Sequence, residues 1–265
     1  MSIRTTAVAG QFYPADASQI RAMFEHYNNI LDQHIRDPKL LEKASRAIIV
    51  PHAGYIYSGF TANIAHRILG NSGVKRVVVI GPSHRVYLNG TSVSDYESYE
   101  TPLGDLPIDR ELVRTLRERF GLSFLPQAHQ EHSTEVQMPF IKTYLPDTKV
   151  VELVYGDENP EHLAKIIEYL LEDPDTGVVI STDLSHYYDI KQAKRLDAIC
   201  LEAVKEESTE LLHKGCEACG KIGVEAMLIA AKKLHLAPLL LDYRTSADAS
   251  GDESQVVGYM SAAFV

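Results

Sequence analysis

Ala47-Ile48-Ile49-Val50-Pro51-His52 begins as a β-branched apolar run and ends in a stiff turn that carries a histidine. The same order of features recurs in Val77-Val78-Val79-Ile80-Gly81-Pro82-Ser83-His84, and again in Val178-Val179-Ile180-Ser181-Thr182-Asp183-Leu184-Ser185-His186. Near-continuous apolar runs of this length are typical of parallel strands that are covered on both faces. The three segments therefore predict three buried strands, each followed by a polar loop.

Amphipathic segments alternate with these runs. Residues 16–33, for example, begin with Asp16 and Gln19 in a capping arrangement and place apolar side chains on one side. Such alternation predicts one α/β domain over residues 1–265, with a central, mostly parallel sheet flanked by helices. Residues 89–107 and 121–130 are expected to be insertions of short strands and turns. Further strands are expected at 150–154, 239–243 and 256–264, and further helices at 59–69, 109–120, 136–145, 159–171, 189–205 and 220–234.

The composition is that of a globular protein and argues against several classes. Of the 265 residues, 45% are hydrophobic, far from the signature of disorder. Lys and Arg total 26 against 36 for Asp and Glu, and this net charge of −10 argues against a general nucleic-acid binder. The first residues lack the apolar segment of a signal peptide, and no apolar run is long enough to span a bilayer. We expect a cytoplasmic protein, of a size common among homo-oligomers, that binds neither nucleic acid nor membrane.

The three cysteines are Cys200, Cys216 and Cys219. Because a disulfide scaffold needs more cysteines and an even number of them, we expect a reduced protein. Cys216 and Cys219 have the C-x-x-C spacing of a zinc half-site or a redox pair, but no second pair completes a four-cysteine zinc site. Cys219 alone is the better candidate, because Gly220 and an apolar helix follow it. A thiol at a helix N-terminus has a depressed pKa and is a good metal ligand.

The crevice of an open parallel sheet lies beyond the carboxyl ends of its strands. His52, His84 and His186 each follow a predicted strand, so we expect them to gather there. Pro51 and Pro82 stiffen the turns before two of them, as a metal ligand requires, and neutral imidazole is the commonest side-chain ligand for Zn, Fe and Cu. The alternative is that each histidine caps a turn or bonds a backbone carbonyl.

Two further polar positions accompany these histidines. Asp183 lies three residues before His186 and either orients an imidazole or caps the following turn. His132 stands in Glu131-His132-Ser133-Thr134-Glu135 before a helix-like segment, where it is either functional or an ordinary surface imidazole.

An ordered set of motifs resembles the Memo family across essentially the whole chain. The microbial members of that family are the Memo-like component, protein B, of the AmmeMemoRadiSam system. The motifs are Val8-Ala9-Gly10-Gln11-Phe12-Tyr13-Pro14, Pro51-His52-Ala53-Gly54-Tyr55, Gly81-Pro82-Ser83-His84, Thr101-Pro102-Leu103-Gly104, Glu131-His132-Ser133, Ser181-Thr182-Asp183-Leu184-Ser185-His186 and Cys219-Gly220-x-x-Gly223.

The resemblance implies a fold like that of the class III extradiol dioxygenases, which are non-haem iron enzymes. It implies a metal site of His52, His84 and Cys219, with His186 close by either as the acid-base residue or as a histidine that supports the ligands. Asp183 and His132 are further catalytic candidates from their positions in the sequence. Fe(II) is the first expectation for the metal, with Cu or Zn as alternatives. Those dioxygenases complete their site with a carboxylate, so a thiolate here departs from their pattern, and ring cleavage does not carry over.

Three functions follow from the resemblance. The first is a metal-dependent oxidoreductase that acts on an unknown small-molecule substrate, with His186 moving a proton. The second is a binding module that recognises a peptide or partner protein in the same cleft, lined by Tyr55, Tyr57 and Arg85. The third is metal storage or chaperoning. AMMECR-type and radical SAM proteins are the partners that the resemblance implies.

Overall fold

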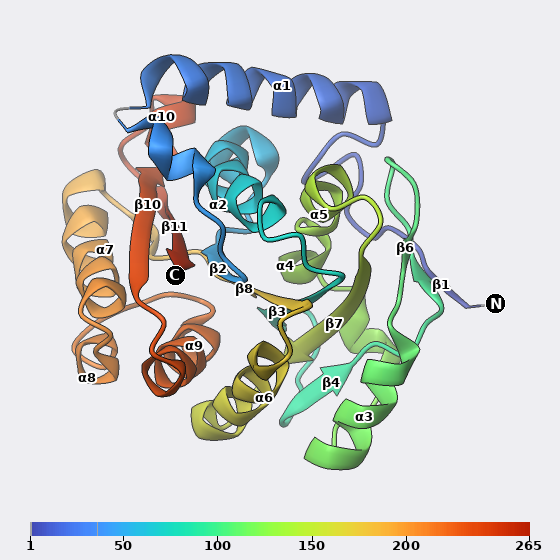
Figure 1. The fold of residues 1–265 in the computed structure, drawn as a ribbon. Helices are drawn as coiled ribbons and strands as arrows, with labels where there is room; N and C mark the ends of the chain where they lie inside the picture. The colour runs from blue at the N-terminus through green and yellow to red at the C-terminus, as the bar shows by residue number, and fades with distance from the viewer. Residues whose placement is uncertain (1, 36) are drawn as a thin grey trace.

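The computed structural model describes residues 2–35 and 37–265 and places a central sheet between layers of helices (Figure 1). The described part of this sheet has eight strands. In spatial order these are β10 (Pro238–Thr245), β11 (Val256–Phe264), β2 (Ala47–Val50), β8 (Thr176–Ser181), β3 (Arg76–Pro82), β7 (Lys149–Tyr155) and β4 (Thr91–Val93), while β9 (His186–Tyr188) pairs with β11.

The sheet is parallel at its centre and antiparallel at its sides. Strands β2, β8, β3 and β7 run parallel, whereas β11 is antiparallel to β2 and β4 is antiparallel to β7. The apolar runs of β2 and β8 are fully buried, as expected for strands covered on both faces. The predicted α/β fold is confirmed, with a mixed, largely parallel sheet.

Helices cover both faces of this sheet (Figure 1). On one face lie α1 (Ala17–His34), α2 (Phe60–Gly70) and α5 (Met138–Tyr144), and on the other lie α6 (Pro160–Glu172) and α9 (Lys221–Leu234), with α7 (Ile190–Lys205) beside β10 and β11. The sequence starts these helices with capping residues. Asp16, for example, accepts a hydrogen bond from the Gln19 amide, and α1 then buries one apolar stripe.

The predicted insertions contain short elements, of which β4 joins the edge of the main sheet and the others lie beside it. A small sheet joins β1 (Ile3–Arg4), β5 (Ser98–Tyr99) and β6 (Leu106–Pro107), and α3 (Arg110–Phe120) follows it. The remaining elements are single turns or short helices: η1 (Pro38–Glu42), η2 (Tyr55–Gly59), η3 (Pro126–His129), α4 (His132–Glu135), α8 (Thr209–Leu212) and α10 (Ala247–Ser250).

The cysteines differ from the expectation of a fully reduced chain. Cys200 and Cys216 form a disulfide, because the turn after α7 folds the chain back and brings their Cα atoms to 4.9 Å. Cys219 is free, so the C-x-x-C spacing is not a bonded pair. Among the helices of the described residues, none combines the length and the hydropathy that crossing a membrane requires.

Candidate metal centre

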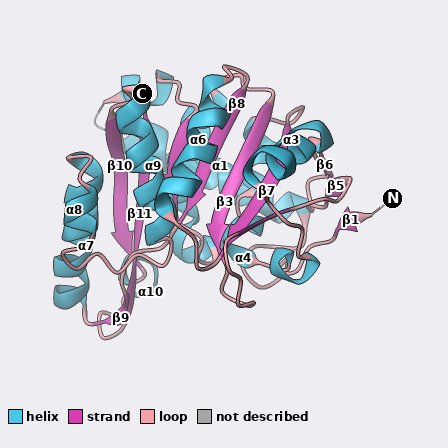
Figure 2. Cartoon of the chain, turned by 90° about the horizontal axis from the view of Figure 1, so that it is seen from below, coloured by secondary structure: helices cyan, strands magenta, loops and turns pink. Residues whose placement is uncertain are grey.

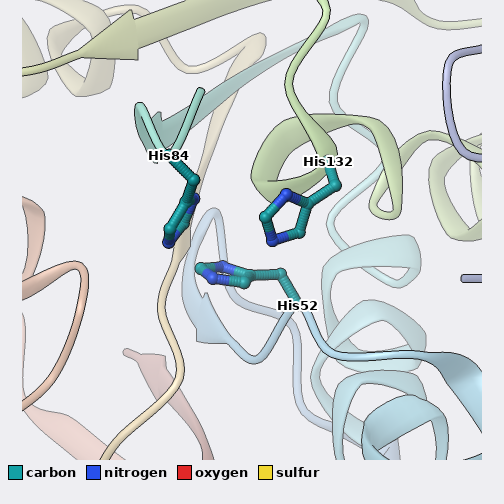
Figure 3. Close-up of side chains that lie close together, drawn as sticks. All are labelled: His52, His84 and His132. Carbon is teal, nitrogen blue, oxygen red and sulfur yellow. The ribbon is translucent and has the colours of Figure 1, made fainter. Parts of the chain in front are cut away.

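His52, His84 and His132 come together, as Figure 3 shows. His52 and His84 follow the carboxyl ends of β2 and β3, and the arrowhead of β3 points toward α4, the helix of His132 (Figure 2). Each offers one ring nitrogen, and the three nitrogens lie within 4.8 Å of one another. The ring centroid of His52 is 5.2 Å from that of His84 and 5.4 Å from that of His132, and the last two are 4.6 Å apart. The prediction that His52 and His84 meet at one crevice is confirmed.

His132 belongs to this group, although the sequence analysis placed it among the catalytic candidates. It is the first residue of α4, which a buried ion pair between Arg4 and Glu135 anchors. The Glu135 carboxylate also accepts hydrogen bonds from the amide of Val8 at 2.9 Å and the hydroxyl of Tyr13 at 2.7 Å. The N-terminal segment thereby fixes the helix that presents His132.

Glu131 sets the orientation of two of the three histidines. Its Oε1 accepts a hydrogen bond from Nδ1 of His84 at 3.1 Å and from Nδ1 of His132 at 2.9 Å. Burial would raise the pKa of Glu131, but the hydrogen bonds from both imidazoles and from the His84 amide hold it well below its usual range. Because an ionised carboxylate can only accept, both imidazoles donate from Nδ1 and keep Nε2 free.

Ser181 fixes His52 in the same way. The Ser181 hydroxyl donates to the carbonyl of Ser133 at 2.5 Å and accepts from Nε2 of Gln137 at 3.0 Å. Its single proton is therefore used, so Nδ1 of His52, 2.9 Å away, must donate to it. The Gln137 amide is itself oriented, because its Oε1 accepts from Nε2 of His66 at 3.0 Å. Nε2 of His52 is consequently also unprotonated.

Three nitrogen lone pairs therefore face one another, which is the arrangement a bound cation requires. Burial lowers the pKa of His52 well below its usual value, and His84 and His132 lower it further, so this imidazole is neutral and able to ligate. Carboxylate or hydroxyl partners on the second ring nitrogen are the usual support of metal-ligating histidines. Imidazole donors suit Fe, Zn and Cu, so the residues fit a transition metal.

The site is closed on one side and open on the other. The side chain of His52 is 2% exposed, that of His132 is 17% exposed, and that of His84 is 31% exposed. The Phe12 ring covers His132 with its centroid 4.7 Å away. The His84 side of the group is therefore the side most accessible to solvent.

Glycines allow the backbone of these loops to pack closely. A Cβ atom on Gly81, just before His84, would lie 2.6 Å from the hydroxyl oxygen of Ser133. A Cβ atom on Gly220 would lie 2.7 Å from the carbonyl oxygen of Ser181. Neither position has room for a side chain, so both loops depend on glycine.

Cys219 lies beside His52 but outside the group of three histidines. Its Sγ is 3.3 Å from Nε2 of His52 and accepts a hydrogen bond from the Asp183 amide, also at 3.3 Å. Burial, together with the charge of Asp183, raises the pKa of this thiol to about 12. The expectation of a depressed pKa is therefore wrong, because desolvation outweighs the helix N-terminus. Its role as a ligand stays a prediction.

Asp183 contacts the group of three histidines, whereas His186 is not one of its members. Asp183 accepts a hydrogen bond from the backbone amide of His52 at 2.7 Å, and its second oxygen is 4.0 Å from Nε2 of His52. Burial raises the pKa of Asp183 above its usual value. His186 begins β9, and its charge is a smaller cause of the lowered pKa of His52, after burial and the other histidines. Their catalytic roles stay predictions.

The groups that orient the three histidines were not predicted from the sequence. Glu131 and Ser181 were quoted within motifs, but no role was assigned to either, and Gln137 was not considered. The position of Glu131 directly before His132 is the one usable signal, since carboxylates commonly accept from metal-ligating histidines. No spacing in the sequence connects Gln137 or Ser181 with His52.

Comparison with known proteins identifies the family. The model for the Memo-like protein family matches residues 4–263. A protein of Metallosphaera sedula named as a MEMO1 family protein is 34% identical, covering 98% of this chain and 99% of its own length. Proteins of the same name from Aquifex aeolicus and Archaeoglobus fulgidus are 32% and 31% identical, and each comparison covers at least 99% of both chains. This chain therefore belongs to the Memo family.

Proposed function

We propose that this chain is a metal-dependent oxidoreductase that binds Fe(II) through His52, His84 and His132 and acts on a small molecule. The observation that carries the proposal is the convergence of three ring nitrogens whose partner nitrogens are all tied to hydrogen-bond acceptors. The resemblance of the family to class III extradiol dioxygenases supports iron ahead of copper or zinc. The open side at His84 supports turnover ahead of storage.

Cys219 is proposed to join the ligands as a thiolate. Its sulfur is near enough to the free nitrogen of His52 to share a metal with it. With its pKa raised to about 12, the metal-free thiol is protonated, so ligation must release a proton. Asp183 is proposed to accept that proton, because its charge acts on the thiol and its carboxylate lies 4.0 Å from Nε2 of His52.

The metal would supply electrons to oxygen or to the substrate. Side chains of the protein would move protons and exclude water. His186 is proposed to donate or accept the proton of the reacting group, while Phe12 excludes water from the His132 side. Substrate would enter past His84. AMMECR-type and radical SAM partner proteins, and self-association, stay predictions from the resemblance.

Metal loading tests the proposal directly. Protein purified without oxygen should contain iron, and adding Fe(II) to the metal-free form should raise its melting temperature. His52→Ala and His84→Ala should lose this shift while remaining folded, because they remove ligands. His162→Ala is the matched control, since His162 also donates to a carboxylate, Glu158, at 3.2 Å but has no place in the group.

Two results would contradict the proposal at different levels. If no metal co-purifies and Fe(II), Cu(I) and Zn(II) all leave the melting temperature unchanged, the metal site is wrong. If the protein binds iron but consumes no oxygen with any member of a panel of small phenols and thiols, the oxidoreductase assignment fails. Metal storage then becomes the better interpretation.

A further inference from the structure

Tyr187, the middle residue of β9, has a left-handed backbone with φ of 63°. A bulky residue rarely adopts this conformation, because its Cβ atom crowds the backbone. Two other described non-glycine residues have positive φ, Glu207 and His235, and both follow helices. His235 closes the C-terminus of α9, where a left-handed residue is common. Tyr187 has no such explanation.

Hydrogen bonds on both sides hold Tyr187 in place. Before it, the amide of Leu184 donates to the carbonyl of Gly258 at 2.8 Å, and the amide of Gly258 donates back to the carbonyl of Ser185 at 3.0 Å. The buried carboxylate of Asp197 accepts from the Ser185 amide at 2.9 Å. After it, Tyr188 pairs with Val256 of β11. The surrounding chain therefore imposes the strained conformation.

The Tyr187 side chain gains little within the molecule to offset that strain. It is 71% exposed, and the aromatic partner of its ring among the described residues is His186, with centroids 5.9 Å apart. Strained residues that the surrounding structure holds in place are concentrated at binding sites. An exposed aromatic ring in such a conformation, directly after a histidine of the site, points to contact with something outside the chain.

Other exposed apolar side chains lie on the same histidine-bearing loops. Tyr57 and Ile56 follow His52, and Tyr87 follows His84, with 40%, 68% and 85% exposure respectively. Exposed aromatic side chains thus lie on each of the loops that carry His52, His84 and His186.

We propose that Tyr187 is a specificity-determining residue, held in a strained conformation so that its ring contacts a flat, apolar part of the substrate that extends out of the metal centre. This inference rests on the proposed function, because it requires a ligand at the metal. It adds that the substrate reaches beyond the histidines, and that the fold gives up stability to present this ring.

The test uses two variants that relieve the same strain at different places. Tyr187→Gly removes the ring and the strain, whereas His235→Gly removes an equally left-handed residue on an exposed helix end. Both should raise the melting temperature of the metal-free protein by about 2–4 °C, because glycine adopts positive φ without crowding. Tyr187→Phe keeps the ring and should leave the melting temperature unchanged.

Ligand binding is then measured on the Fe(II)-loaded proteins without oxygen, using 4-nitrocatechol as a flat chelating probe and azide as a small one. Tyr187→Gly should weaken the binding of 4-nitrocatechol by about tenfold, which is the magnitude of one lost aromatic contact, and leave the affinity for azide unchanged. Tyr187→Phe and His235→Gly should bind both probes as the wild type does.

Unchanged affinity of Tyr187→Gly for 4-nitrocatechol, or no binding of this probe to an iron-loaded wild type, overturns the inference alone. An unraised melting temperature for Tyr187→Gly overturns the claim of strain. Failure of the wild type to bind Fe(II) at all overturns the proposed function and the inference with it.

Discussion

Replacing Glu131 by Gln should weaken metal binding about a hundredfold without unfolding the protein. Oε1 of Glu131 accepts from the imidazoles of His84 and His132, while Oε2 accepts from the His84 amide at 2.7 Å. Whichever way a glutamine amide is turned, its NH₂ group faces at least one N–H. Loss of one such supporting contact typically costs 10- to 100-fold in metal affinity, and Glu131 supports two ligands, so we expect about 100-fold, or about 2.7 kcal/mol.

Zn(II) affinity, measured by competition with a chromophoric chelator, checks this value without interference from oxidation. Glu158→Gln is the matched control, because it also removes a carboxylate that pairs with an imidazole but lies outside the metal centre. A dissociation constant for Glu131→Gln within about threefold of the wild type, against the 10- to 100-fold typical of such contacts, would refute the assigned role of Glu131. Equal weakening in Glu158→Gln would show that the effect is not local.

Three further outcomes are expected. Ser181→Ala removes the acceptor for Nδ1 of His52, so Zn(II) affinity should fall about tenfold in the same competition assay, and an unchanged value would contradict the assigned tautomer. Burial lowers the pKa of His66 to about 4 from its usual 6.5. The free energy of unfolding should therefore be at its maximum with respect to this group above pH 6.5 and fall by about 3 kcal/mol as the pH approaches 4. In urea unfolding, the free energy of His66→Gln should lack most of that pH dependence. A pH dependence equal to that of the wild type would contradict the assignment to His66. Gly81→Ala should lower the unfolding free energy by about 1–3 kcal/mol, because its Cβ meets the Ser133 hydroxyl; a fully stable variant would contradict this packing.

The sequence predicted the elements of the fold well, because each carries a local signal. The run 47–50 coincides with β2, and 256–264 coincides with β11. Asp16 caps α1 as the pattern predicts, and Asp189, where the helix over 189–205 was expected to begin, is the cap of α7. The direction of β11 could not be predicted, since an apolar run looks alike in parallel and antiparallel strands. The antiparallel sides of the sheet are therefore the part of the topology that required coordinates.

The site was predicted in part, and the reason is geometric. His52 and His84 follow parallel strands, so the rule that strand ends share an edge brought them together. His132 follows no strand, and it reaches the centre because Arg4 and Glu135 anchor its helix across a long sequence separation. The Cys200–Cys216 disulfide depends likewise on how a turn folds back after α7. Such contacts leave no periodic trace in the sequence.

The neighbours of β2 also constrain the order in which this protein can assemble. One side of the strand pairs with β8, roughly 130 residues further along, and the other side pairs with β11, more than 200 residues further along. Contacts so distant in sequence form slowly, because long loops must close first. We therefore expect the group of histidines around His52 to form late in folding, so that a metal bound there would enter a protein that has already folded.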